Sequence, residues 1–197
     1  MPATTTRNRA GWVLAGGRST RMGRDKALLD LGSGPLAARA AGLVAQACGN
    51  ATVVGDPARY ANLGFPAIPD NQPGLGPLSG IEAALAATDS DWNLIVACDM
   101  PLLNPAIFEA LFAALADGGD CALPRHPDGR VEPLCAVYHR RCHYAVQTAL
   151  ASGIRRVTDG LKSLAVRYVQ TESGDPFTNL NTPGDLRQFD VRKFSDG

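Results

Sequence analysis

The chain has 197 residues, a length that fits a single domain with a substantial hydrophobic core. Apolar residues make up 45% of the chain and charged residues 19%, and these near-average values exclude a disordered protein or a coiled coil. The 19 basic side chains balance the 19 acidic ones, so the chain offers no bulk charge to nucleic acid or to an acidic membrane surface. A phosphate-containing ligand would therefore be bound by a few placed residues.

The N-terminal segment and the distribution of apolar residues predict a cytoplasmic protein. Residues 1–10 are polar and lack an apolar h-region, so they are interpreted as a flexible tail before a single domain at residues 11–197. No run approaches the roughly 20 apolar residues that a membrane span needs. The five cysteines include no C-x-x-C pair, which argues against a disulfide framework and a structural zinc site, and most are expected to be buried.

Short apolar runs alternate with longer Ala- and Leu-rich segments along the chain. The apolar runs predict strands at residues 12–15, 51–55, 67–70, 92–98, 120–124, 134–138 and 164–169. The longer segments predict helices at residues 35–48, 78–88, 105–116, 139–151, 155–162 and 183–189, with Asn104 and Thr182 as caps of two of them. Strands separated by helices of this length are typical of βαβ units, so we expect an α/β fold with a mostly parallel sheet.

The first expected strand continues directly into a loop that is rich in glycine and in basic residues. Glycines let a backbone approach a ligand closely and present N–H groups to phosphate oxygens. The loop also carries four cations, Arg18, Arg21, Arg24 and Lys26. An ordinary loop with solvated arginines is the alternative, but Gly-Gly after a buried strand together with this charge favours a nucleoside triphosphate site. The candidate nucleotide-binding residues here are Leu14, Ala15, Gly16, Gly17 and Lys26.

Two better-known nucleotide motifs do not match this chain. The Walker A string G-x-x-x-x-G-K-[ST] does not occur, and Gly16-Gly17 lacks the spacing of a dinucleotide fingerprint. Residues 32–37 match only the loose G-x-G-x-x-A form and are interpreted as a turn before a helix that starts near Pro35. An NAD(P)-dependent oxidoreductase therefore lacks support from a fingerprint.

Asp99 follows the most apolar of the expected strands. Ligands of parallel sheets bind at the carboxyl ends of strands, where a carboxylate suits Mg²⁺ together with phosphate oxygens and water. An aspartate in this position can instead cap a turn, and Pro101 fixes a turn here in either case. From the residues alone, both interpretations of Asp99 stay open.

Five segments of the chain together resemble one family of enzymes. They are residues 14–26, 76–80, 97–101, 132–138 and 179–183, which contain Ala-Gly-Gly with Met-Gly-x-Asp-Lys, Gly-Pro-Leu-Ser-Gly, Ala-Cys-Asp-Met-Pro, Glu-Pro-Leu-Cys-Ala-Val-Tyr and Asn-Leu-Asn-Thr-Pro. In this combination the chain is similar to the molybdenum cofactor guanylyltransferases, the MobA family of the nucleotide-diphospho-sugar transferase superfamily. The resemblance extends over nearly the whole chain after Gly11, whereas the first segment alone would indicate only the superfamily.

The resemblance implies both a fold and an activity. The fold is a three-layer, Rossmann-like α/β fold of the nucleotide-diphospho-sugar transferase type with a mostly parallel central sheet. The activity is the Mg²⁺-dependent transfer of GMP from GTP to the phosphate of molybdenum-molybdopterin, with release of pyrophosphate. A molybdopterin-loading protein or a recipient molybdoenzyme is the protein partner that the resemblance implies.

The resemblance also assigns roles to individual residues. Asp99 is expected to bind Mg²⁺ with the nucleotide phosphates, and Arg21 and Lys26 to hold the β- and γ-phosphates; these three are the expected catalytic residues. Asp70 is expected to contact the base or the ribose. The active site is expected to be lined further by Asn179 and Asn181.

One departure from the family pattern keeps alternatives open. Gly55 stands where family members often carry an asparagine that contacts guanine, so backbone atoms or Asp56 would have to take its part. A cytidylyltransferase or a sugar-phosphate nucleotidyltransferase of the same fold is therefore an alternative, as is a nucleotide-binding module without turnover. Arg155, Arg156 and the loop 125–130 either bind an anionic acceptor or form a solvated basic face.

Overall fold

The computed structural model describes residues 8–15, 25–180 and 185, and a seven-stranded sheet runs through this part of the chain. The first and fourth strands are six residues long and lie side by side in its middle. The strands are β1 (Arg9–Leu14), β2 (Thr52–Val54), β3 (Ala67–Ile68), β4 (Trp92–Ala97), β5 (Cys121–Arg125), β6 (Cys135–His139) and β7 (Val166–Gln170).

The order of the strands is β3-β2-β1-β4-β6-β5-β7, and most neighbours run parallel, as the sequence predicts. The exception is β6, which lies antiparallel between β4 and β5. Because β5 is antiparallel to β6, it again runs in the direction of β4. The carboxyl ends of β1, β2, β3, β4 and β5 consequently share one edge of the sheet.

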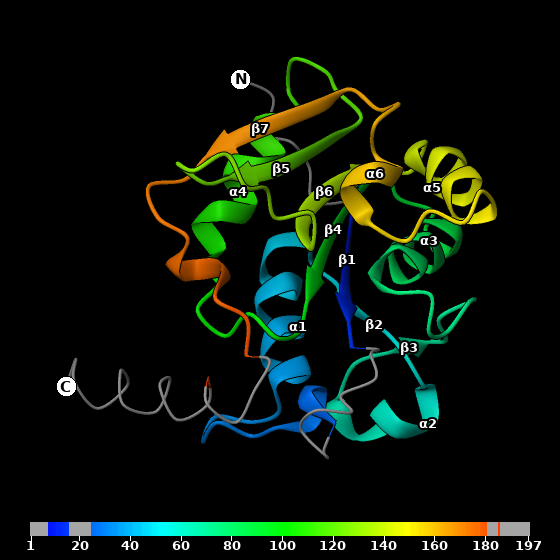
Figure 1. Ribbon diagram of the computed structural model, residues 1–197. Helices are drawn as coiled ribbons and strands as arrows, with labels where there is room; N and C mark the ends of the chain where they lie inside the picture. The colour runs from blue at the N-terminus through cyan, green and yellow to red at the C-terminus, as the bar shows by residue number, and fades with distance from the viewer. Residues whose placement is uncertain (1–7, 16–24, 181–184, 186–197) are drawn as a thin grey trace.

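Helices cover both faces of the sheet, which gives the three layers of the fold (Figure 1). On one face lie α1 (Leu36–Cys48) and α4 (Pro105–Ala113), and on the other α3 (Pro77–Ala87), α5 (Cys142–Ala151) and α6 (Val157–Gly160). Shorter helical segments are η2 (Lys26–Leu28), α2 (Pro57–Tyr60), η3 (Ala61–Leu63) and η4 (Asp175–Phe177). No helix in the described ranges is both long and apolar enough to cross a bilayer.

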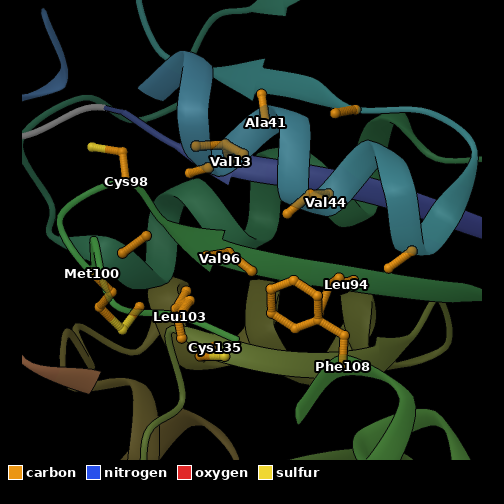
Figure 2. Packing of buried hydrophobic residues seen from close by; sticks show 14 of the residues in the cluster. Val13, Ala41, Val44, Leu94, Val96, Cys98, Met100, Leu103, Phe108 and Cys135 are labelled. Carbon is orange, nitrogen blue, oxygen red and sulfur yellow. The ribbon is translucent and has the colours of Figure 1, made fainter. Parts of the chain in front are cut away.

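The central strands are apolar on both faces because both faces are covered. Leu94 and Val96 of β4 pack toward α1 and α4, whereas Ile95 packs toward α3 and α5. Figure 2 shows the ring of Phe108, from α4, beside Leu94. Such burial on both faces explains the near-continuous apolar run that identifies this strand in the sequence.

The first strand begins earlier than the sequence predicts. Strand β1 starts at Arg9, whereas the sequence predicts a tail up to residue 10 and a strand from residue 12. Arg9 is polar but buried: its guanidinium lies 3.7 Å from the centre of the Phe112 ring and 3.0 Å from the Glu109 carboxylate. Gly11 lets α1 pack closely, since a Cβ there would lie 2.2 Å from Cγ1 of Val44. Contacts with residues distant in the chain thus place in a strand residues that the sequence predicts as part of a tail.

Other differences concern short elements and element ends. Helix α5 starts at Cys142 instead of residue 139, because His139 still pairs with Trp92 in the sheet. The sequence predicts neither α2 nor η3, which are too short to show a helical period. Asn104 caps α4 as predicted, with Oδ1 accepting a bond from the Ala106 N–H at 2.9 Å. All five cysteines are buried and free, and the helix expected at 183–189 lies outside the described residues apart from position 185.

Asp120, immediately before β5, links this strand to the residues that come directly before β7 and α5. Its Oδ2 accepts a bond from the Ala165 N–H at 2.8 Å, and its Oδ1 lies 2.5 Å from Nε of Arg141. The Ala165 hydrogen bond first, and then Arg141, lower the pKa of Asp120 below its ordinary value.

Acid is therefore expected to destabilise the protein partly through Asp120. Since its pKa is lower in the folded state, its stabilising contribution is present above the unfolded value of about 3.9 and is lost as the pH falls through the folded value. The Asp120→Asn protein should show a shallower loss of unfolding free energy as the pH is lowered from about 5 through and below the unfolded value. Urea unfolding across this range measures it, and equal slopes for both proteins would contradict it.

Candidate functional site

The shared carboxyl edge of the strands brings the ends of β1 and β4 together. The Ala15 N–H donates to the Val54 carbonyl at 3.0 Å, and the Cys98 N–H donates to the Leu14 carbonyl at 3.1 Å. These bonds continue the sheet one residue beyond the strand ends. The carboxyl end of β1 is thereby held next to Cys98 and Asp99, the two residues that come after β4.

An ion pair between Lys26 and Asp99 lies at the centre of this edge. Nζ of Lys26 lies 3.0 Å from Oδ2 of Asp99, and each side chain is 19% exposed. The other carboxylate oxygen, Oδ1 of Asp99, is buried and has no hydrogen-bond partner in the part of the chain that the structure describes. A buried carboxylate oxygen left in this way costs free energy unless a cation or a donor binds it.

The residues around Asp99 limit the chemistry available there. Burial, and then the charge of Asp99, raise the pKa of the neighbouring Cys98 thiol to about 12, so Cys98 is a poor nucleophile at neutral pH. The described residues include no group of three or more His, Cys, Asp and Glu side chains placed to hold a metal. Mg²⁺ does not require such a group, since it binds through one or two carboxylates plus phosphate and water.

Asp25 holds the short helix that carries Lys26. Its Oδ1 accepts a bond from the Ala27 N–H at 3.0 Å and caps η2, which is the usual role of an aspartate before a helix. Its Oδ2 lies 3.0 Å from the Tyr60 hydroxyl and 3.2 Å from Nη1 of Arg59. None of these three residues is among the predicted site residues. Aspartate directly before lysine at a helix start is a local signal for Asp25, whereas α2 is too short to give one for Arg59 and Tyr60.

Asp70 lies after β3 at the same edge and folds the loop that follows it. Its Oδ1 accepts a bond from the Gln72 N–H at 2.9 Å, and its Oδ2 accepts one from the Ser79 hydroxyl at 2.8 Å. These bonds fit the turn role of an aspartate, and they tie the loop to the start of α3. Its expected contact with the nucleotide stays a prediction.

The segment after β7 returns to Asp99. The Thr171 N–H donates to the Arg125 carbonyl at 3.0 Å, and the Leu180 N–H donates to the Asp99 carbonyl at 2.9 Å. Between them, the ring of Phe177 packs edge-on against buried His126, whose Nε2 lies 2.7 Å from Oε1 of Glu132. Asn179 is exposed next to Leu180, so the fold brings this expected site residue to the edge where Lys26 and Asp99 lie.

Three of the arginines considered for binding an acceptor, Arg125, Arg130 and Arg155, have partners within the protein. The Arg125 guanidinium lies 3.5 Å from the centre of the Tyr168 ring, and Nε of Arg130 lies 2.7 Å from Asp128. Nη1 of Arg155 donates to the carbonyls of residues 150 and 154, both at 3.0 Å. These internal contacts explain the positions of the three side chains, so a bound ligand is not needed to explain them.

Gly55 and Asp56 are engaged in local structure. The Gly55 N–H donates to the Ile68 carbonyl at 2.8 Å, and Oδ1 of Asp56 accepts bonds from the N–H groups of Ala58 and Arg59 as the cap of α2. Asp56 therefore has a structural role as the cap of α2.

The fold assembles part of the predicted site. Leu14, Ala15, Lys26 and Asp99 come together, with Asp70 and Asn179 on the same edge. The remaining candidates lie outside the described residues: Gly16, Gly17, Arg21 and Asn181.

Comparison with known proteins identifies the family. Residues 11–167 match the family described as MobA-like NTP transferase domain. A probable molybdenum cofactor guanylyltransferase of Pelotomaculum thermopropionicum is 38% identical to this chain over 89% of either chain. The molybdenum cofactor guanylyltransferase of Rhodobacter capsulatus is 36% identical over 93% of this chain and 95% of its own.

A solved structure agrees with these relatives. The molybdopterin-guanine dinucleotide biosynthesis protein A of Archaeoglobus fulgidus superimposes with a TM-score of 0.77 at 27% identity, covering 91% of this chain and 95% of the other. The predicted nucleotide-diphospho-sugar transferase type of fold is thereby confirmed. With the match over most of its length and relatives well above 30% identity, the chain belongs to the MobA-like nucleotidyltransferase family that includes the molybdenum cofactor guanylyltransferases.

Proposed function

We propose that this protein transfers GMP from GTP to the phosphate of molybdenum-molybdopterin and releases pyrophosphate. The names of its relatives support this reaction, and the observation that carries it is the Lys26–Asp99 pair at the carboxyl edge of the sheet. A triphosphate with its metal ion requires a carboxylate oxygen to bind the metal and, close to it, a cation to bind the phosphate oxygens.

Asp99 would hold Mg²⁺ through its carboxylate. Its buried Oδ1, without a partner among the described residues, fits a metal ligand, and Lys26 beside it supplies charge for phosphate oxygens. When bound, Mg²⁺ would neutralise charge on the α-phosphate region of the nucleotide. The dependence of the activity on Mg²⁺ is part of the proposal.

Lys26 would bind the β- and γ-phosphates with Arg21 and the N–H groups of the glycine-rich loop. When the bond between the α-phosphorus and its bridging oxygen breaks, negative charge accumulates on the departing pyrophosphate, which these cations stabilise. The acceptor phosphate forms the new bond to the α-phosphorus. It is already ionised at neutral pH, so positioning and charge stabilisation suffice without a general base.

The other candidates would orient the two substrates. Asp70 would contact the base or ribose, and Asn179 and Asn181 would line the site near Asp99. A cytoplasmic location and transfer of the product to a recipient molybdoenzyme, or receipt of the substrate from a loading protein, complete the proposal. None of these steps uses nucleic acid or a membrane.

Nucleotide specificity is tested by thermal unfolding with Mg²⁺ and, separately, GTP, CTP, ATP or NAD. We expect GTP alone to stabilise the protein, by about 2.7 kcal/mol at 100 times its Kd, or roughly 5–10 °C for a domain of this size. A shift with CTP alone would keep the fold and mechanism but replace the guanylyltransferase with a cytidylyltransferase, which Gly55 leaves open. Binding of GTP without pyrophosphate release in the presence of the acceptor would favour a non-catalytic module.

A further inference from the structure

Tyr60, the last residue of α2, contacts both ends of the glycine-rich segment. Its hydroxyl lies 2.5 Å from the carbonyl oxygen of Ala15, just after β1, and 3.0 Å from Oδ2 of Asp25, just before η2. The side chain is buried, with 2% of the residue exposed. One phenol group therefore bridges two points that are separated in the chain by the expected nucleotide loop.

The bridge continues to Lys26 through Asp25. One oxygen of Asp25 faces the Tyr60 hydroxyl, while the other caps η2 by accepting a bond from the Ala27 N–H at 3.0 Å. A fixed Asp25 thereby fixes the first turn of η2. Lys26 lies in this turn, and its ammonium group is 3.0 Å from Asp99.

The hydroxyl of Tyr60 does more than fill the core. Its ring belongs to the buried cluster under α1, a place that a phenylalanine ring would fill equally well. Burial first, and then the charge of Asp25, raise the pKa of Tyr60 well above its ordinary value, so the phenol keeps its proton. It can donate that proton to either of its two oxygen partners, and a buried donor of this kind is costly to remove.

The segment that carries Tyr60 is itself held in place. Asp56 caps α2 through two backbone N–H groups, and Pro57 occupies its first turn, where the fixed φ of proline is favourable. Arg59 adds a second contact to Asp25 at 3.2 Å. A short helix that is fixed at its start and bonded at its end can act as a rigid support.

We propose that Tyr60 is a positioning residue of the nucleotide-phosphate site, whose hydroxyl joins Ala15 to Asp25 and through Asp25 places Lys26 opposite Asp99. This inference rests on the proposed function for the identity of the nucleotide, and on the described contacts alone for the placement of Lys26. It assigns a functional part to a residue that touches neither substrate.

The Tyr60→Phe protein tests the proposal because it keeps the ring and removes only the hydroxyl. We expect the KM for GTP to rise about tenfold and kcat to fall as well, since a displaced Lys26 both weakens phosphate binding and stabilises less of the charge that accumulates on the departing pyrophosphate. The matched control is Tyr144→Phe on α5, where the tyrosine is 77% exposed, and its kinetics should equal those of the wild type.

A double-mutant cycle separates positioning from general packing. The Kd for GTP is measured for the wild type, Tyr60→Phe, Lys26→Met and the double variant. If Tyr60 acts through Lys26, its substitution should change the affinity by less than about twofold once Lys26 is replaced. A full tenfold effect in the Lys26→Met background would overturn the proposal.

Hydrogen exchange of the Ala27 amide provides a readout without nucleotide. The Ala27 amide should exchange at least about fivefold faster in Tyr60→Phe and, as a second variant, in Asp25→Ala, which removes the capping oxygen, whereas in Tyr144→Phe its exchange should be unchanged. If the wild type binds no GTP but the Ala27 amide exchanges faster in Tyr60→Phe, the proposed function fails, whereas the role of Tyr60 in positioning η2 stands. If GTP is turned over while Tyr60→Phe alters neither its KM nor the exchange of Ala27, the positioning role is wrong.

Discussion

Replacing Asp99 with asparagine is expected to lower kcat/KM for GTP about a thousandfold while the fold is kept. The change removes the negative charge from the only carboxylate that we propose as a ligand for Mg²⁺, at a site where the side chain is 19% exposed and Oδ1 is buried. Losing one charge-stabilising group of this kind typically costs about 10²–10³ in rate, and loss of the metal adds to it. The asparagine keeps the shape of the side chain, so the effect reports charge.

Asp91 supplies a matched control near the same strand. It lies directly before β4, whereas Asp99 lies shortly after it, and it pairs with Arg140 at 3.1 Å at the opposite edge of the sheet. The Asp91→Asn protein should keep kcat/KM within about twofold of the wild type, because exposed ion pairs contribute little. Steady-state pyrophosphate release at several Mg²⁺ concentrations measures both variants. Turnover by Asp99→Asn within tenfold of the wild type would remove Asp99 from the mechanism.

The Phe108→Ala protein is expected to lose about 3–5 kcal/mol of unfolding free energy. Phe108 is fully buried between α4 and the central strands, where Figure 2 shows its ring next to Leu94. Truncation removes the apolar contacts of the ring and leaves a cavity that the close-packed core fills only in part. A loss of this size is a large fraction of the stability of a typical domain.

Phe112, one turn further along α4, provides the comparison. It packs only partly against the same core, and its ring is covered by the guanidinium of Arg9. The Phe112→Ala protein should lose about 1–2 kcal/mol, since less apolar surface returns to water. Urea unfolding followed by circular dichroism gives both values. Equal losses for the two variants would mean that burial at this face of the sheet is not what sets the cost.

The sequence predicts the core of this fold well because burial imposes local patterns. Residues 92–97 are almost continuously apolar since they pack on both faces, and Asn104 before Pro105 marks a helix start because its side chain satisfies a free N–H. Such signals depend only on neighbours in the chain. For the same reason Ala15 and Asp99, which lie just after two of the strands, could be recognised as candidate ligand positions.

The direction and place of β6 were not predictable in this way. Its residues read as an apolar strand whatever their direction, and the sequence does not state that β6 enters between β4 and β5 in the antiparallel sense. The start of α5 differs from the prediction for a related reason, because the pairing of His139 with Trp92 keeps His139 in the sheet. Pairing between strands involves residues far apart in the chain, and local propensity gives no information on it.

By itself, the sequence determined the class of fold, the glycine-rich loop after the first strand, and the carboxylate at the end of the fourth. Only the tertiary structure decided which of these groups meet: Lys26 reaches Asp99 across 73 positions of the chain, and Tyr60 reaches Ala15 across 45. The physical reason is that hydrogen bonds and ion pairs act over a few ångströms and gain strength with burial. Those distances and that burial exist only once the parallel strands have paired and their carboxyl ends share one edge.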